Sequence, residues 1–166
     1  KDKEQTDGSK ALQVCLIRKW AGNNPVAAAG WVEKMAADGP RQEAVNGVAI
    51  IWANQDIPKA IEWAKAMPEG GERQGALLSV AYEAARTEPV QALTVATELK
   101  AGPSTDDLIT HAVMQWTTTD PKEAVAWAKQ ISDPNLQERV ISSVATVWAN
   151  KDPAAAADLA VHMRPG

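Results

Sequence analysis

A phrase of six residues recurs along this chain in steps of 32 residues, with no insertion or deletion between its five copies. The copies begin at Trp20, Trp52, Ala84, Trp116 and Trp148. They end at Pro25, Ile57, Pro89, Pro121 and Pro153. A fixed period of this length is typical of proteins built from stacked structural repeats, in which each unit mainly contacts its neighbours.

The first half of each unit has the signals of a helix start. Pro is well placed at a first helical position, because its missing N–H would be unpaired there anyway. The preceding residue is Asn or Asp in four of the five copies, and these side chains can accept a hydrogen bond from a free backbone N–H. Apolar residues then follow at the spacing of one helical face. We expect first helices over residues 25–37, 57–68, 89–100, 121–132 and 153–163.

A short break containing Gly or Pro follows, and a second amphipathic pattern begins after it. We expect second helices over residues 9–22, 41–54, 73–86, 105–118 and 136–150. Sustained period-2 alternation is absent, so no strand is expected. The sequence therefore predicts an all-α fold, an α–α superhelix (solenoid) of about five stacked helical hairpins.

The repeat also predicts the domain organisation. Residues 1–10 are polar and without apolar periodicity, and we expect them to be a flexible lead-in. Residues 11–166 are expected to form a single domain, with units near 20–51, 52–83, 84–115, 116–147 and 148–166.

All seven tryptophans fall in two columns of the repeat. They are expected to be structural anchors that fill the same kind of niche between hairpins: Trp20, Trp31, Trp52, Trp63, Trp116, Trp127 and Trp148. The third unit lacks both, with Ala84 and Val95 in their places and the only tyrosine, Tyr82, nearby. Two interpretations stay open: the packing has drifted harmlessly, or Tyr82, Ala84 and Val95 mark a candidate pocket.

Charge and composition exclude several classes of function. The net charge of −4 and the pI near 5.2 argue against a nucleic-acid partner, which requires clustered positive charge. No apolar run approaches the roughly 18–20 residues of a membrane span, so no membrane insertion is expected. The single cysteine, Cys15, allows no internal disulfide and is expected in the core. The compartment is left open: a soluble chain, either cytoplasmic or exported after removal of a signal.

No pattern for catalysis or metal binding is found. His111 and His162 lie in different predicted helices, and no pair of ligands has metal-site spacing. Gly-rich phosphate-binding motifs are also absent. We therefore expect no catalytic residue, no metal and no cofactor, and we expect a non-enzymatic protein.

The phrase around Asp120, Pro121 and Trp127 resembles the junction of tetratricopeptide (TPR) repeats, and Pro25 with Trp31 is similar. There a helix ends, Asp-Pro starts the next hairpin, and an early Trp packs between its helices. The period of 32 differs from the family's 34, so the chain is a divergent, TPR-like repeat. The resemblance implies a superhelix with a concave groove that binds a peptide or a partner protein.

If the first helices line that groove, as the resemblance implies, nine side chains form its exposed strip: Glu33, Lys34, Glu62, Lys65, Thr94, Thr97, Glu98, Lys129 and Gln130. The other interpretation of these residues is a solvated face with weak ion pairs. The favoured function is protein or peptide binding, or scaffolding.

An alternative function follows from the apolar pattern of the first and last helices, which is as strong as that of internal copies. Solenoids normally carry polar terminal helices. Two explanations stay open: the 166 residues are one piece of a longer array, or the chain is a structural subunit that stacks head to tail on itself, into a filament or a longer array.

Overall fold

The computed structural model describes the backbone of residues 2–36 and 39–161, and the side chains of residues 8–36, 39–159 and 161. Within this part of the chain every regular element is a helix, which confirms the all-α prediction. The helices are α1 (Asp2–Asn23), α2 (Pro25–Val32), α3 (Gly39–Ala53), α4 (Ile57–Ala66), α5 (Gly71–Ala84), α6 (Pro89–Ala96), α7 (Pro103–Thr117), α8 (Pro121–Ala128), α9 (Pro134–Ala149) and α10 (Pro153–Val161).

Short helices begin where the repeated phrase predicts, and the predicted caps hold them. Side-chain oxygens of Asn24, Asp56 and Asp120 accept hydrogen bonds from backbone N–H groups in the first turns of α2, α4 and α8. Asp152 does the same for α10, over 3.0 Å from the N–H of Ala155. Glu88 stands at the same place before α6 and makes no side-chain cap bond.

Most short helices end about four residues earlier than predicted. After α2 the backbone N–H of Lys34 bonds to the carbonyl of Trp31 at 3.1 Å, and that of Met35 to Val32 at 3.0 Å. These are three-residue steps, so the chain tightens into a turn instead of continuing the α-helix. The predicted end of the last short helix, with His162, lies outside the described residues.

The first helix is longer at its N-terminal end than the predicted range 9–22: α1 begins at Asp2 and runs without a break to Asn23. That residues 1–10 form a flexible lead-in stays a prediction. Residues 2–10 contain no Pro, so no residue in this stretch blocks the continuation of the helix toward the N-terminus. Gly8 has no positive φ, so it does not interrupt the helix.

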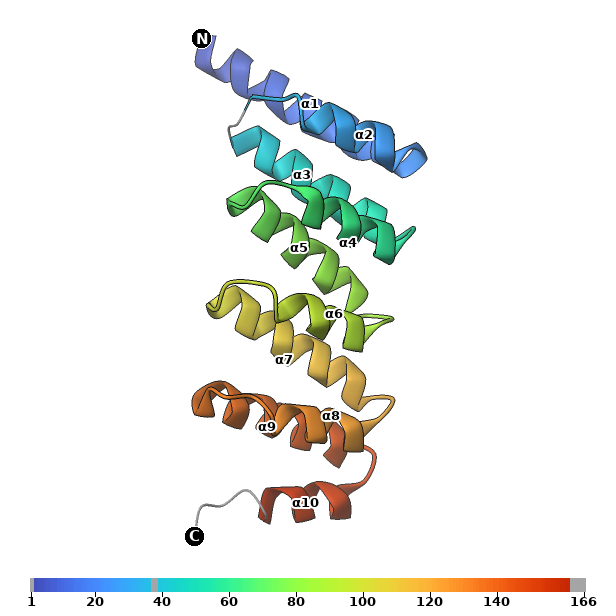
Figure 1. The fold of residues 1–166 in the computed structure, drawn as a ribbon, viewed down its shortest axis with the longest axis vertical. Coiled ribbons are helices and arrows are strands. Elements are labelled where there is room, and N and C mark those ends of the chain that lie inside the picture. The colour runs from blue at the N-terminus through green and yellow to red at the C-terminus, as the bar shows by residue number, and fades with distance from the viewer. Residues whose placement is uncertain (1, 37–38, 162–166) are drawn as a thin grey trace. The chain divides into compact units, whose positions relative to one another are not determined.

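The chain divides into two compact units, residues 1–84 and 85–166. In unit 1 the long helices α1, α3 and α5 pack side by side; α2 contacts α1 and α3, and α4 contacts α3 and α5 (Figure 1). In unit 2, α7 packs against α9, α6 contacts α7, α8 contacts both long helices, and α10 contacts α9. The single continuous domain over residues 11–166 stays a prediction.

The core of each unit lies along its long helices. In unit 1 the side chains of Val14, Ile17 and Val48 are at most 4% exposed. In unit 2 Val113 and Val144 are fully buried. Burying a side chain of this size contributes on the order of 1.5–3 kcal/mol, so the packing of one long helix on the next holds each unit together.

Candidate functional site

The tryptophans do not share one environment, contrary to the equal niche that their columns predicted. Trp52 on α3 is 7% exposed, whereas Trp20 on α1 and Trp31 on α2 are each 41% exposed. Trp63, Trp116, Trp127 and Trp148 are half-buried. Trp52 is therefore the most enclosed of the seven rings, the others are partly open to solvent, and the anchor role of the seven stays a prediction.

In unit 1 two rings meet between neighbouring short helices. The ring centres of Trp52 and Trp63 lie 5.6 Å apart, with the planes tilted by 34°. The indole Nε1–H of Trp63, on α4, donates a hydrogen bond to Glu33 Oε1, at the end of α2, over 3.3 Å. Trp63 thus bridges from the long helix α3 to the preceding short helix.

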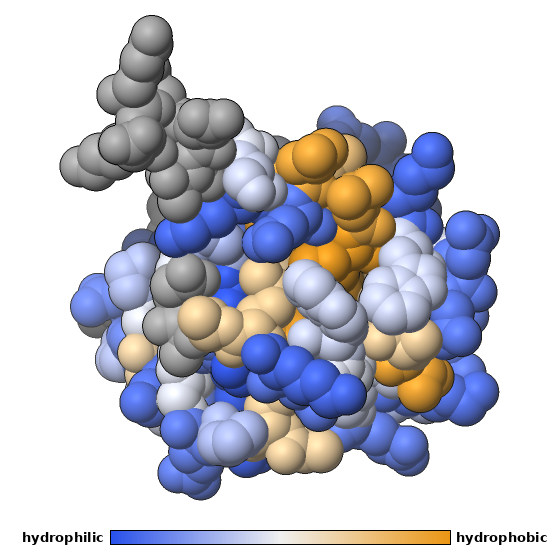
Figure 2. Space-filling view, turned by 90° about the horizontal axis from the view of Figure 1, so that it is seen from above, coloured by the Kyte–Doolittle hydropathy of each residue, from blue (hydrophilic) through white to orange (hydrophobic). Residues whose placement is uncertain are grey.

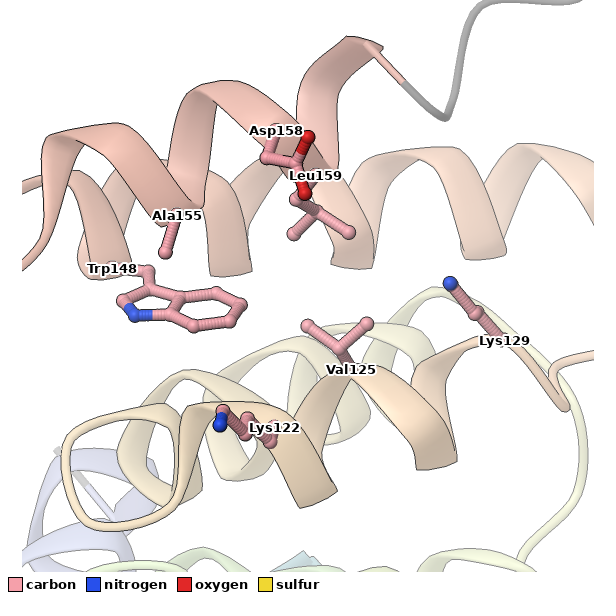
Figure 3. A pocket seen from close by; sticks show the side chains of 7 residues that line it. All are labelled: Lys122, Val125, Lys129, Trp148, Ala155, Asp158 and Leu159. Atoms are coloured by element: carbon pink, nitrogen blue, oxygen red, sulfur yellow. The ribbon is translucent and has the colours of Figure 1, made fainter.

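In unit 2 the corresponding place is hollow (Figure 3). Val125 of α8 and Leu159 of α10 point toward one another across this space, with the ring of Trp148 from α9 at its side. The hollow is open to solvent and has a volume of about 440 Å³. We call it the α8–α10 hollow; seven side chains line it: Lys122, Val125, Lys129, Trp148, Ala155, Asp158 and Leu159.

A second hollow of about 670 Å³ lies beside the start of α6 and the end of α7. We call it the α6–α7 hollow. Its lining comes from two stretches of unit 2: Thr87, Glu88, Pro89, Val90, Gln91 and Thr94, and Trp116 and Thr119. Trp116 occupies the same column of the repeat as Trp148, so each of the two hollows has a tryptophan in its wall.

The predicted groove residues are on the surface, and three of them lie at these places. Lys129 lines the α8–α10 hollow, Thr94 lines the α6–α7 hollow, and Glu33 holds the indole of Trp63. The remaining side chains are exposed, apart from the half-buried Lys65: Lys34, Glu62, Thr97, Glu98 and Gln130. The nine residues are divided between the two units, so the single continuous strip stays a prediction.

The candidate pocket in the third unit also stays a prediction. Ala84 is fully buried, Val95 is 2% exposed, and Tyr82 is half-buried. None of these three lines the α8–α10 or the α6–α7 hollow.

Sequence reasoning missed Lys122 and Asp158 as lining residues, although a signal for this site was present. Leu159 stands in the column that holds Trp31, Trp63 and Trp127. The same substitution of an aromatic by a smaller residue directed attention to Val95 in the third unit, but the α8–α10 hollow lies beside Leu159.

The side chains of Asp56 and Lys59 have shifted pKa values. A side-chain hydrogen bond from Lys59, joined by the bond from the Lys59 backbone N–H, lowers the pKa of Asp56 below its usual value. The same carboxylate raises the pKa of Lys59. The Nζ–Oδ2 distance is 2.7 Å, and the backbone N–Oδ1 distance is 3.0 Å. Both groups belong to the start of α4, so this pair supports a helix cap and is not a sign of acid–base chemistry.

Other charged pairs join successive long helices. Arg41 on α3 contacts Glu72 on α5 at 3.0 Å, and Arg139 on α9 lies 3.6–3.8 Å from Asp106 and Asp107 on α7. These pairs are partly solvated, so each contributes at most about 1 kcal/mol. They add to the packing of the long helices.

Among the described residues, no group of three or more His, Cys, Asp or Glu side chains is arranged to hold a metal ion. His111 is half-buried on α7, and His162 lies outside the described part. None of the helices in residues 2–36 and 39–161 has the length and apolar character needed to cross a membrane. Comparisons of the chain with protein-family models, with curated proteins and with solved structures find no match.

Proposed function

We propose that this chain is a non-enzymatic, TPR-like α-solenoid that binds a protein or an extended peptide along its short helices. The observation that carries the proposal is the α8–α10 hollow, an open site between two short helices with Trp148 in its wall. Apolar walls with a few charged groups at the rim are the usual composition of a recognition site.

The repeat supports more than one such site. The α6–α7 hollow has Trp116 in its wall, and Trp116 and Trp148 are 32 residues apart. Two open sites in one unit suit an extended chain better than a compact small molecule. Aromatic residues are enriched at protein interfaces because they combine a large apolar area with a polar group.

A peptide-display selection against the whole chain tests this function. Binders from a random library are expected to lose at least about fivefold in affinity for a variant carrying Thr94→Arg and Lys129→Glu, which alters both hollows. Lys19→Glu, an exposed charge change on α1, is the control and is expected to leave binding unchanged. A selection that yields no binder, or binders insensitive to the double variant, contradicts the proposal.

A second function, head-to-tail stacking, is favoured by the free face of α1. Leu12, Leu16 and Trp20 on this face are 59%, 57% and 41% exposed. Figure 2 shows hydrophobic residues gathered among hydrophilic ones at this end of the molecule. One repeat later, α3 packs against α1 with the same columns buried, as Ala44 and Val48 at 0% exposure show.

The complementary face is that of α9. Ala149 there is exposed, whereas Thr117, in the same column on α7, is 1% exposed. A second copy whose α1 packs on this α9 face would bury both surfaces as the internal repeats do. Sedimentation velocity is expected to show association that grows with concentration and is lost in Leu16→Glu. A single monomeric species at high concentration excludes this second function.

A further inference from the structure

We propose that the α8–α10 hollow binds an aromatic side chain of a partner peptide, next to an acidic residue of that peptide. The inference rests on the proposed binding function and names the ligand chemistry of one site. It follows from comparing this hollow with its counterpart in unit 1, where the chain itself supplies the aromatic ring.

The two places are equivalent positions of the repeat, three periods apart. Trp148 corresponds to Trp52, and Leu159 corresponds to Trp63. Lys129 corresponds to Glu33. The site in unit 1 lies between the short helices α2 and α4, beside Trp52 of the long helix α3. The hollow in unit 2 lies between α8 and α10, beside Trp148 of α9.

Unit 1 shows how the place is filled when an aromatic residue is present. The ring of Trp63 packs on Trp52, with 5.6 Å between ring centres, and reaches Glu33 with its N–H group. Such tilted ring pairs are favourable beyond the area that they bury. This is the one tryptophan pair of its kind among the described residues, because two other pairs stand in the same two columns without such a contact: Trp20 with Trp31, and Trp116 with Trp127. The Trp52–Trp63 pair therefore shows one arrangement in which a ring packs over the long-helix tryptophan.

At the α8–α10 hollow that ring is absent, because Leu159 stands in the column of Trp63. Leu159 has a short, branched side chain, and it is only 8% exposed because it lies down toward Val125. The space beside Trp148 is left as the hollow of about 440 Å³. This space accommodates an indole or phenol ring from another molecule, which would then pack on Trp148 as Trp63 packs on Trp52.

The charges at the rim select among aromatic ligands. Lys122 and Lys129 extend from α8, and Asp158 comes from α10 (Figure 3). The ammonium groups outnumber the carboxylate, so a ligand cation is disfavoured and a carboxylate beside the ring is favoured. In unit 1 the position of Lys129 is held by Glu33, which accepts the indole N–H. At the α8–α10 hollow the ammonium group of Lys129 takes the place of the Glu33 carboxylate. This site is therefore expected to prefer an anionic ligand group, whereas the unit 1 site accepts an N–H donor.

Binding of defined peptides to the full chain tests the proposal. The ¹⁵N-labelled protein has seven indole N–H signals, and Trp148→Phe identifies the one from Trp148. Acetyl-Gly-Glu-Trp-Glu-Gly-amide is expected to shift the Trp148 signal in a saturable way. Replacing the peptide's Trp by Leu is expected to weaken binding about five- to tenfold, and replacing both Glu by Lys by at least as much.

A variant that fills the hollow with a side chain of the protein itself gives a more direct test. Leu159→Trp places a ring where Trp63 has one, so it is expected to abolish the peptide-induced shift. Leu159→Met keeps the residue apolar and of similar volume and is the control that retains binding. Lys122→Glu with Lys129→Glu changes only exposed side chains, so it tests the charge preference even if the Leu159 variant folds poorly.

Binding of the Leu peptide as tight as that of the Trp peptide overturns the inference, as does undiminished binding to Leu159→Trp folded as wild type. If library-selected peptides bind at the α6–α7 hollow but no aromatic–acidic peptide shifts Trp148, the inference fails and the proposed function stands. If no library peptide binds anywhere, the proposed function fails as well.

Discussion

At the scale of single residues, the repeated phrase acts through its capping position. The side chains of Asn24, Asp56 and Asp120 are short enough to turn back on the first helical turn. Glu88 has one more methylene group and makes no such bond, although its backbone angles (φ −132°, ψ 62°) are near those of Asp120 (φ −137°, ψ 83°). The cap was predictable from the sequence because it depends on residue type and local backbone alone.

Restoring the cap of α6 is expected to stabilise the protein. Glu88→Asp supplies an acceptor within reach of the first-turn N–H groups, and a cap of this kind contributes about 0.5–1 kcal/mol. Urea unfolding followed by circular dichroism measures the difference. Glu88→Gln, which cannot form the short cap, is the control and is expected to match wild type. Equal unfolding midpoints for Glu88→Asp and Glu88→Gln contradict the expectation.

The cap of α4 is expected to depend on pH. Because the pKa of Asp56 is lower in the folded chain, its stabilisation is present above the usual Asp pKa and is lost as pH falls through the folded-state pKa. Asp56→Asn retains an oxygen acceptor without the charge, so its stability is expected to fall less on acidification.

NMR titration of the Asp56 carboxyl measures the shift directly. Lys59→Met removes the ammonium group that is the main cause of the shift, so the pKa of Asp56 is expected to rise toward its usual value. An unchanged pKa in Lys59→Met would show that Lys59 is not the cause.

At the scale of helices, the period predicted where elements start better than where they end. Pro at or next to the first helical position marks each short-helix start, four of the five starts have an Asn or Asp cap, and all five starts were predicted within the described chain. The ends depend on where the chain must turn back to the next long helix, as the tightened turn after Val32 shows. The helical start of α1 was missed because residues 2–10 have no apolar stripe, and the prediction relied on the stripe.

Glycines in these helices are expected to differ in their response to Ala. Gly30 lies inside α2 with open space around it, so Gly30→Ala is expected to stabilise by about 0.5–1 kcal/mol. A Cβ at Gly75 on α5 would lie 2.7 Å from Gln42 Nε2 and 2.9 Å from Asn46 Oδ1, which bond to each other at 3.0 Å.

Losing that bond costs on the order of 1 kcal/mol, which offsets the gain in helix propensity. Gly75→Ala is therefore expected to leave stability within about 0.5 kcal/mol of wild type. Thermal and urea unfolding of both variants give the comparison. A stabilisation by Gly75→Ala as large as that by Gly30→Ala would show that the Gln42–Asn46 pair moves aside at no cost.

At the scale of the whole molecule, the sequence predicted which residues are on the surface but not where that surface is hollow. Lys129 and Thr94 were selected as exposed positions on short helices, and both line hollows. The hollow at Leu159 depends on the volume that one side chain leaves unfilled beside Trp148, and a pattern of apolar and polar residues does not report volume. A comparison of side-chain sizes down the repeat column marks Val95 and Leu159 alike, and only Leu159 lines one of the two hollows, so this signal does not single out the site.

The proposed head-to-tail stacking makes a prediction about one pair of residues. Gly47 on α3 lies against Arg18 on α1, with only 2.8 Å between an added Cβ and Arg18 Cγ. Cys15 holds the column of Gly47 on the free face of α1, where it is exposed and not in the core as expected from the sequence. Thr146 on α9 stands in the same column of the repeat as Arg18, and it is exposed. A second copy stacked with the repeat's own geometry therefore brings its Cys15 next to Thr146 of the first.

Thr146→Cys is expected to form a ladder of disulfide-linked oligomers under mild oxidation, because each chain then has one partner at either end. Wild type, with Cys15 alone, can form nothing larger than a dimer. Ala126→Cys places a second exposed thiol on α8, away from the α9 face, and is expected to give no ladder. Disulfides require Cβ atoms about 3.5–4.5 Å apart, so the ladder reports register as well as association. Non-reducing gel electrophoresis across a range of concentrations reads the result, and equal ladders from both variants would indicate random collision in place of ordered stacking.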